Sequence, residues 1–292
     1  MTAPRPTAPV GLALCLLVCL PVGGVSAPRV EWRPPTPRVG DVVAAEVLES
    51  SPQVTLAGEL GGVPLIFSAH GDRQVAVAGV DLDAQPGARS WRIEIRQAGQ
   101  PPRALSGHLT VTARNFSVQR LTLPKGMVDL DPETERRALS EGARLRAVYG
   151  TITPERLWRG RFIRPVGGEE SGSGFGARRV INGQPRAPHT GVDYSAPTGA
   201  PVFAANAGQV ALVAEYFFPG RLVVLDHGLG LHTLYFHLDR VSVGEGQNVE
   251  RGAIIGSVGA TGRATGPHLH FGVQIGEARV DPDVLLALAL PE

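Results

Sequence analysis

The alternation of hydrophobic and polar residues predicts that the chain is mainly β-structure. Between residues 30 and 118, short apolar runs are separated by glycine- and proline-rich turns. In the clearest run, Trp91, Ile93 and Ile95 alternate with charged residues. The other strands expected here cover residues 42–48, 53–57, 63–68, 74–82 and 104–112. Strands of this length and spacing are typical of a small β-sandwich of immunoglobulin-like shape.

The pattern changes between residues 120 and 165, where helix signals appear. Asp131 is typical of a helix N-cap and Pro132 of the first helical position, so we expect a helix that reaches Val148 and stops at Gly150. Residues 153–158 begin with Thr-Pro-Glu and predict a second helix of one or two turns. This segment is interpreted as a helical connector whose arginine and glutamate residues form a solvated face.

A second β-rich region follows, and it is expected to form an antiparallel sheet. Its predicted strands cover residues 201–205, 208–214, 221–226, 231–237, 254–258 and 268–275, and a short helix over 284–290 follows the cap residue Asp281. In the last strand a period of two places His268 and His270 on one face and four apolar residues on the other. This predicts a half-buried strand with two imidazoles about 7 Å apart on its open face. In the strand 231–237, Tyr235 and His237 are predicted to share a face.

The N-terminus has the features of a secretory signal. Arg5 is its only charge, an apolar run extends from Val10 to Leu20, and small residues follow. Cleavage is favoured after Ser26, and an uncleaved anchor stays open as an alternative. The expected organisation is a signal peptide (1–27), a sandwich-like domain (28–119), a connector (120–161) and a β-sheet domain (162–292).

Cysteine content and charge restrict the chemistry of the mature chain. Both cysteines, Cys15 and Cys19, lie in the predicted signal segment, so a metal site must be built from histidines and carboxylates. Without Arg5 the chain has 27 basic and 27 acidic residues, which gives no indication of a nucleic-acid partner.

Six of the eight histidines lie in the second β-rich region. There, His189 and Asp193 are four residues apart where a loop enters a strand, and His268 and His270 share a later strand. Two histidines, one carboxylate and an open fourth position are what a catalytic zinc ion requires. From the spacing alone, both His268 and His270 are candidate ligands.

Other histidines have simpler interpretations. His70 and His108 lie in the first region without neighbouring metal ligands, and they are predicted to be ordinary surface or turn residues. His227 follows Asp226 at a predicted junction of strand and turn, and His232 is expected to pack on the inner side or reach a backbone carbonyl.

These motifs resemble peptidase family M23, the lysostaphin- or LytM-type peptidoglycan endopeptidases. The H-x-x-x-D element is matched by His189 and Asp193, the Y-x-H-L element by Tyr235–Leu238, and the final H-x-H by His268 and His270. The flanking residues 175–178, 197–202 and 261–267 also agree, so the resemblance covers about residues 162–286. It implies a zinc metallopeptidase fold for this part of the chain.

The resemblance also implies a role for each site residue. His189, Asp193 and His270 would bind one Zn²⁺ per chain, and His237 and His268 would be the catalytic pair. We assign the general base to His268 and oxyanion stabilisation to His237, although the two roles are interchangeable at this stage. Tyr235 either orients its strand neighbour or is a packed aromatic residue.

The function expected from this resemblance is hydrolysis of peptide crosslinks between peptidoglycan stem peptides. Bridges between D-alanine and diaminopimelate are favoured over glycine bridges, and the location would be the periplasm or cell envelope of a bacterium. No stable membrane insertion is expected after signal cleavage. The alternative is a non-catalytic LytM-type activator of cell-wall amidases, which the presence of all five site residues disfavours. A regulatory hypothesis is autoinhibition, in which the N-terminal region or the connector covers the substrate groove.

Overall fold

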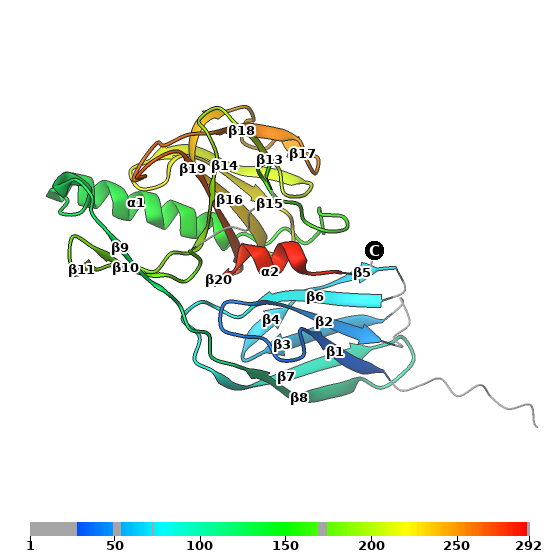
Figure 1. The fold of residues 1–292 in the computed structure, drawn as a ribbon. Coiled ribbons are helices and arrows are strands. Elements are labelled where there is room, and N and C mark those ends of the chain that lie inside the picture. The colour runs from blue at the N-terminus through cyan, green and yellow to red at the C-terminus, as the bar shows by residue number, and fades with distance from the viewer. Residues whose placement is uncertain (1–27, 49–53, 72, 169–173, 291–292) are drawn as a thin grey trace, which may run out of the picture.

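The computed structural model describes residues 28–48, 54–71, 73–168 and 174–290, which form two β-rich bodies linked by a long helix (Figure 1). The predicted signal peptide lies outside the described residues. Within the described ranges, no helix combines the length and apolar character that a membrane span needs.

The N-terminal body is a sandwich of two four-stranded antiparallel sheets, with strand orders β1-β2-β6-β5 and β4-β3-β7-β8. The bounds are β1 Arg29–Arg33, β2 Val42–Leu48, β3 Thr55–Leu60, β4 Val63–Leu65, β5 Phe67–His70, β6 Arg73–Gly79, β7 Gly87–Arg96 and β8 Arg103–Val111. Alternate residues of β7 enter the core between the sheets, where Ile93 and Ile95 are buried and Trp91 is partly buried. The predicted β-sandwich is therefore confirmed, and its immunoglobulin-like topology stays a prediction.

The connector contains β9 (Val118–Leu121), a 3₁₀ turn η1 (Lys125–Met127) and the helix α1 (Pro132–Tyr149). The Asp131 carboxylate accepts hydrogen bonds from the backbone of Glu133 and Thr134, and the helix ends at Gly150 as predicted. Leu145, Val148 and Tyr149 pack with apolar residues of the C-terminal sheet, so α1 covers part of one face of that sheet.

The predicted second helix over 153–158 is wrong. This segment is not helical, and it crosses the turn between two strands of the C-terminal sheet. The backbone N–H of Leu157 donates to the His227 carbonyl, and the N–H of Leu229 donates to the Thr153 carbonyl. These hydrogen bonds to a distant part of the chain replace those that a helical turn would form.

The C-terminal body is built on a nine-stranded antiparallel sheet whose main order is β12-β19-β16-β15-β14-β17. Its strands are β12 Gly191–Ser195, β13 Pro201–Phe203, β14 Gly208–Tyr216, β15 Gly220–Asp226, β16 Leu231–Val241, β17 Asn248–Val249, β18 Ile254–Val258, β19 His268–Ile275 and β20 Ala278–Val280. A small sheet beside it joins β9 to β10 (Arg178–Ile181) and β11 (Gln184–Pro185). The helix α2 (Pro282–Ala287), capped by Asp281, begins two residues earlier than predicted.

The expectation that β19 is half-buried is also wrong. Every residue of β19 after His268 is buried, because the strand lies between β12 and β16 and both of its faces are covered. Phe271 and Val273 enter the main core, while on the opposite face the ring of Phe236 stacks on His270 with centroids 5.3 Å apart.

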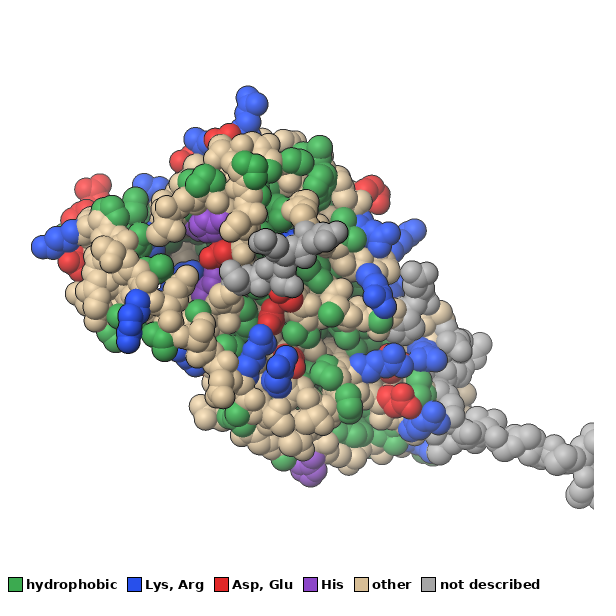
Figure 2. Space-filling model, viewed as in Figure 1, with side chains coloured by type: hydrophobic (Ala, Val, Ile, Leu, Met, Phe, Trp, Pro, Cys, Tyr) green, Lys and Arg blue, Asp and Glu red, His purple; other side chains and the backbone are tan. Residues whose placement is uncertain are grey.

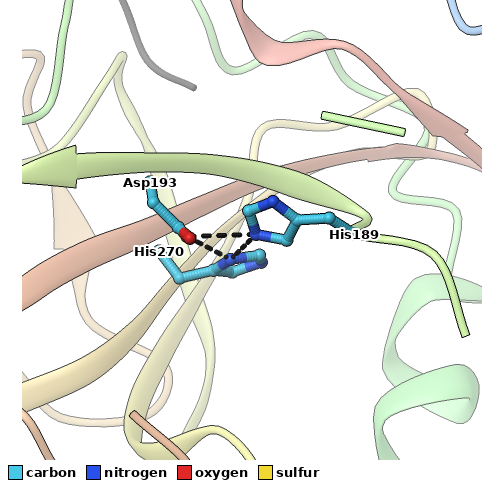
Figure 3. Close-up of side chains that lie close together, drawn as sticks. All are labelled: His189, Asp193 and His270. Atoms are coloured by element: carbon cyan, nitrogen blue, oxygen red, sulfur yellow. Dashed lines mark hydrogen bonds and ion pairs between the residues drawn. The ribbon is translucent and has the colours of Figure 1, made fainter. Parts of the chain in front are cut away.

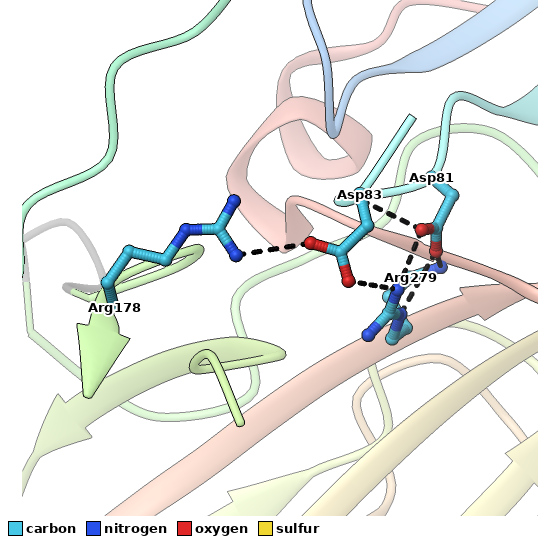
Figure 4. A network of polar contacts seen from close by, with 4 residues as sticks. All are labelled: Asp81, Asp83, Arg178 and Arg279. Carbon is cyan, nitrogen blue, oxygen red and sulfur yellow. Dashed lines mark hydrogen bonds and ion pairs between the residues drawn. The ribbon is translucent and has the colours of Figure 1, made fainter. Parts of the chain in front are cut away.

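The two bodies are docked against each other by apolar and charged contacts. Leu82 of the sandwich side belongs to the same buried core as the C-terminal strands. The Arg279 guanidinium donates to Asp81 at 2.7 Å and to Asp83 at 3.0 Å, and Arg178 donates to Asp83 at 3.1 Å (Figure 4). Arg279 thus fixes the sandwich to β20, and Arg178 fixes it to β10, the strand that approaches the histidines described below.

His70 also belongs to this interface, so its predicted place at the surface is wrong. Its side chain is buried, bonds to Ser68 and Arg156, and packs against Trp158 with ring centroids 6.5 Å apart. His70 is therefore buried by contacts with Arg156 and Trp158, which belong to the other part of the chain.

Candidate metal centre

Two neighbouring strands place a carboxylate and an imidazole on the same face of the sheet. Asp193 of β12 is paired directly with His270 of β19, and directly opposed residues of antiparallel strands point to the same side. His189 lies just before β12, where its N–H donates to the Ala177 carbonyl and its own carbonyl accepts from Gly176. These two backbone hydrogen bonds fix the position of His189 next to the strands that contain Asp193 and His270.

The three side chains converge on one point (Figure 3). Asp193 Oδ1 lies 3.0 Å from His189 Nε2 and 3.0 Å from His270 Nδ1, and the two nitrogens are 2.8 Å apart. All three potential ligand atoms come from buried or half-buried residues and lie within 4.8 Å of one another.

Two glycines allow the chain to approach this cluster closely. A Cβ at Gly191 would lie 2.8 Å from His270 Nε2 and 2.4 Å from the Phe271 carbonyl oxygen. Gly174 has φ of +90°, and a Cβ there would lie 2.6 Å from His189 Nδ1. Larger residues at these positions would push against the imidazoles that form the cluster.

His237 reaches the cluster through a local break in the strand. Its φ is +64°, in the left-handed region, and the pairing of β16 shifts register next to it. The ring of His237 lies 4.8 Å from that of His268 and 6.1 Å from that of His270, centroid to centroid. The prediction that Tyr235 and His237 share a face is therefore wrong, because the positive φ interrupts the strict alternation.

Tyr235 itself lies in the core. Its hydroxyl accepts from the Ala205 backbone at 2.8 Å and hydrogen bonds with the Thr233 hydroxyl at 2.9 Å, while its ring packs on Phe271. Burial raises the pKa of the Tyr235 phenol above its ordinary value. Of the two interpretations open for Tyr235, packing is the one that these contacts support.

Each of the rings of His237 and His268 is oriented by a hydrogen bond to a backbone carbonyl. His237 Nδ1 donates to the Thr261 carbonyl at 2.8 Å, and His268 Nδ1 donates to the Gly266 carbonyl at 2.8 Å. The tautomer that these bonds require leaves each Nε2 with a free lone pair. His268 Nε2 lies 3.7 Å from Asp193 Oδ1. The pair thus presents two basic nitrogens next to the three convergent atoms.

The charge states of the cluster suit a divalent cation. Burial acts to raise the pKa of Asp193, but hydrogen bonds from His189 and His270 outweigh it and hold that pKa well below the usual range. Burial, together with neighbouring imidazoles, lowers the pKa of His270 to about 4 and that of His237 to about 3. At neutral pH Asp193 is therefore ionised and His270 is neutral, which are the forms that bind zinc.

The donor atoms also fit zinc by their spacing. Tetrahedral zinc with bonds of about 2.0–2.1 Å holds its ligand atoms about 3.3 Å apart. The observed separations of 2.8–3.0 Å would have to open by only a few tenths of an ångström. With no cysteine in the described residues, two nitrogens and one oxygen are the donor set expected of a catalytic site that keeps a fourth position open.

Part of the site is accessible from the surface, since the side chains of Asp193 and His268 are 26% and 16% exposed. Figure 2 shows histidine side chains and an acidic side chain close together in a hollow of the surface. Sequence reasoning missed Arg179, on β10, whose positive charge acts on both Asp193 and His270. No motif marks Arg179, since only the pairing of β10 with the chain around β9 and β11 brings it here.

Comparison with known proteins gives consistent matches. The profile of Peptidase family M23 matches residues 187–282. A Pseudomonas aeruginosa protein whose crystal structure was solved as a candidate M23 peptidase shares 33% sequence identity, with a TM-score of 0.67 over 86% of this chain and 95% of that chain.

Curated relatives match little more than a third of this chain. The peptidoglycan DD-endopeptidase ShyB of Vibrio cholerae serotype O1 is 42% identical over 37% of this chain and 26% of its own length. The DD-carboxypeptidase/endopeptidase Mpg of Neisseria meningitidis serogroup B is 46% identical over 36% of this chain and 24% of its own length. The matched stretch thus spans about a quarter of each relative.

Proposed function

This chain belongs to peptidase family M23, and from that premise we propose that it is a zinc metalloendopeptidase that hydrolyses the peptide crosslinks of peptidoglycan. The observation that carries the proposal is the convergence of His189 Nε2, Asp193 Oδ1 and His270 Nδ1 on one point. These residues would hold one zinc ion per chain. The relatives named DD-endopeptidase favour the bond between D-alanine and diaminopimelate as the one that is cut.

The two remaining histidines divide the proton chemistry. Zinc, when bound, would polarise the substrate carbonyl and lower the pKa of a water molecule. His268 Nε2 accepts a proton from the attacking water and returns it to the leaving amine. His237 would stabilise the negative oxygen that develops on the former carbonyl by donating from Nε2. Because its Nδ1–H is already donated to Thr261, this role requires a second proton on the ring, which the negative charge of that oxygen would favour. The carbonyls of Thr261 and Gly266 keep both rings oriented throughout.

The proposed substrate defines the proposed location. Peptidoglycan lies outside the cytoplasmic membrane, so the enzyme would be exported to the periplasm or cell envelope, with residues 1–27 as its signal peptide. Edman sequencing of the protein recovered from the producing cell would give a new N-terminus at Ala27; an N-terminus at Met1 would contradict cleavage.

Digestion of diaminopimelate-type peptidoglycan by the mature chain tests the activity directly. We expect crosslinked muropeptides to disappear, with about one zinc per chain in the same sample. The matched control is His268→Ala, which should keep its zinc and lose about 10²–10⁴-fold in rate. Absence of both zinc and cleavage would reject the enzyme and favour the amidase activator.

We also propose that the N-terminal body limits access to the site, because it is docked to the segment that leads to His189. Phe116 and Phe175 meet edge to face at 6.1 Å across this contact, and Arg114 lies over both rings. Deleting the sandwich would remove Leu82 and expose the apolar residues of the C-terminal core that it packs against. Loosening the charged contact is therefore the better experiment.

The double variant Asp81→Asn, Asp83→Asn removes the charges that hold Arg279 and Arg178. If the docked sandwich restricts access, cleavage of crosslinked peptidoglycan should become several-fold faster than in the control Glu250→Gln, which changes one exposed carboxylate of the sheet body. Equal rates in both variants would reject autoinhibition.

A further inference from the structure

Three arginines lie together beside the metal centre. Arg179 is on β10 and Arg186 follows β11, and the N–H of Arg186 donates to the Arg179 carbonyl at 2.9 Å. This bond continues the antiparallel pairing in which Val180 faces Pro185. Arg179 and Arg186 are therefore opposite each other, with their side chains on one face of the hairpin.

Arg263 joins them from the loop before β19. Its N–H donates to the Phe218 carbonyl at 2.9 Å, and its guanidinium lies 4.1 Å from the centroid of the Phe218 ring. A guanidinium stacked on an aromatic ring has a fixed plane and keeps its edge free for hydrogen bonds. Arg186, Arg263 and Phe218 line one hollow of about 330 Å³, whose other wall is formed by α1 and the residues Val128 and Leu130 that precede it.

The positive charge of this group is poorly compensated. Arg179 Nε donates to the neutral Gln119 side chain at 3.3 Å, and Arg186 Nη2 donates to the Val128 carbonyl and to Gln184. Asp129 forms a long ion pair with Arg186 at 3.8 Å, Glu135 lies on the wall of the hollow, and the charge of Asp193 in the metal centre acts on Arg179. In the part of the chain that the structure describes, no carboxylate forms an ion pair with the guanidinium of Arg179 or Arg263.

Electrostatic effects agree with this arrangement and connect it to the metal centre. Burial, followed by the charges of Arg179 and Arg186, lowers the pKa of Arg263 to about 10. The charge of Arg179 also acts on His270, and that of Asp193 acts on Arg179. The cationic group thus extends from the convergent ligand atoms into the neighbouring hollow.

We propose that Arg179, Arg186 and Arg263 form a subsite that binds a free carboxylate of the substrate peptide next to the bond that is cut. A guanidinium fork matches a carboxylate in geometry and charge, and like charges placed opposite each other on a hairpin are unfavourable unless an anion joins them. The preferred substrate class is accordingly an acidic stem peptide. The proposal rests on the proposed peptidase function.

The test compares two probes, a crosslinked stem-peptide dimer with free carboxylates and the same dimer after amidation of those carboxylates. The wild-type mature chain should cleave the free form with a kcat/KM at least about 10-fold higher. In Arg263→Gln and Arg179→Gln, KM for the free form should rise about 10-fold and kcat should change less. In Arg263→Gln, cleavage of the amidated form should stay at the wild-type rate. Arg263→Lys keeps the positive charge but not the planar guanidinium. Its KM for the free form should therefore lie between those of wild type and Arg263→Gln.

The matched control is Arg240→Gln, which removes one exposed arginine of β16 away from the hollow and should change neither rate. Zinc content of each variant verifies that the metal centre is intact. If wild type cleaves both dimers equally, or if the variants slow both dimers equally while zinc is retained, the carboxylate subsite is rejected and the peptidase function stands. If wild type cleaves neither dimer, both proposals fail together.

Discussion

Two pairs of buried histidines belong to the same sheet and differ in what their nitrogens contact. At one end, His189 and His270 meet at Asp193. At the other end, His227 and His232 are both fully buried near Asp226, which β15 pairs with His232. Burial alone therefore does not separate a candidate metal centre from a structural pair.

The difference lies in where the donor atoms point, because hydrogen bonding does not separate the pairs: both ring nitrogens of His232 lack a hydrogen-bond partner among the described residues. His227 Nδ1 donates to the Ala207 carbonyl at 2.7 Å, and Nε2 lies 2.7 Å from the Thr233 hydroxyl, so both nitrogens have protein partners. His232 Nε2 lies 3.8 Å from Asp226 Oδ1. At the other pair, two nitrogens and one carboxylate oxygen point at one another within 3.0 Å. A shared focus of donor atoms, and not burial, marks the place for a cation.

The largest expected effect comes from alanine at one member of each pair. His270→Ala removes a proposed ligand, and since outer-shell partners alone are worth about 10–100-fold in metal affinity, zinc binding should weaken by more than about 100-fold. His227→Ala should leave zinc binding unchanged and lower the free energy of unfolding by about 2–4 kcal/mol, because it leaves a cavity and unpaired polar groups.

Zinc titration and urea denaturation of the two variants check this contrast. We expect His270→Ala to lose zinc binding and His227→Ala to lose stability. If His227→Ala lost zinc as strongly as His270→Ala, the two ends of the sheet would not be distinct and the comparison would fail.

A smaller effect is expected in the pH dependence of stability. Burial lowers the pKa of His227 to about 4, against about 6.5 in the unfolded chain. The unfolded state therefore takes up a proton first, so this contribution is complete above about pH 6.5 and is lost as the pH falls towards 4. The loss amounts to about 3 kcal/mol at most.

His227→Gln removes this titration while keeping a polar side chain. The variant should be less stable than wild type at pH 7, and the difference in the free energy of unfolding should decrease as the pH falls from 6.5 to 4. Urea denaturation of the metal-free proteins at several pH values measures it. A difference that stays constant across this range would show that His227 does not carry the pH dependence.

Much of the local structure was predictable from the sequence because its causes are local. Asp131 and Pro132 specify the start of α1 through capping, and the alternation in β7 specifies which residues enter the sandwich core. The strands β2, β18 and β19 were predicted with the bounds that the structure has. The residues of the candidate site were identified from motif spacing and resemblance, and their roles stay predictions.

The errors share a different cause, which is contact between distant parts of the chain. Residues 153–158 look like a helix start, but their backbone groups bond to the turn around His227. His70 looks like a turn residue until the second body covers it. Residue identity within a short window contains no information about such partners.

The sequence by itself determined the β-rich composition, the capped helix and the set of histidines and carboxylates available for chemistry. Tertiary structure decided which of them meet: strand pairing joins Asp193 to His270, a positive φ turns His237 away from the Tyr235 face, and a hairpin brings Arg179 beside them. The physical reason is that periodicity and capping act within a few residues, whereas a binding site requires atoms from segments that are 81 residues apart, as His189 and His270 are.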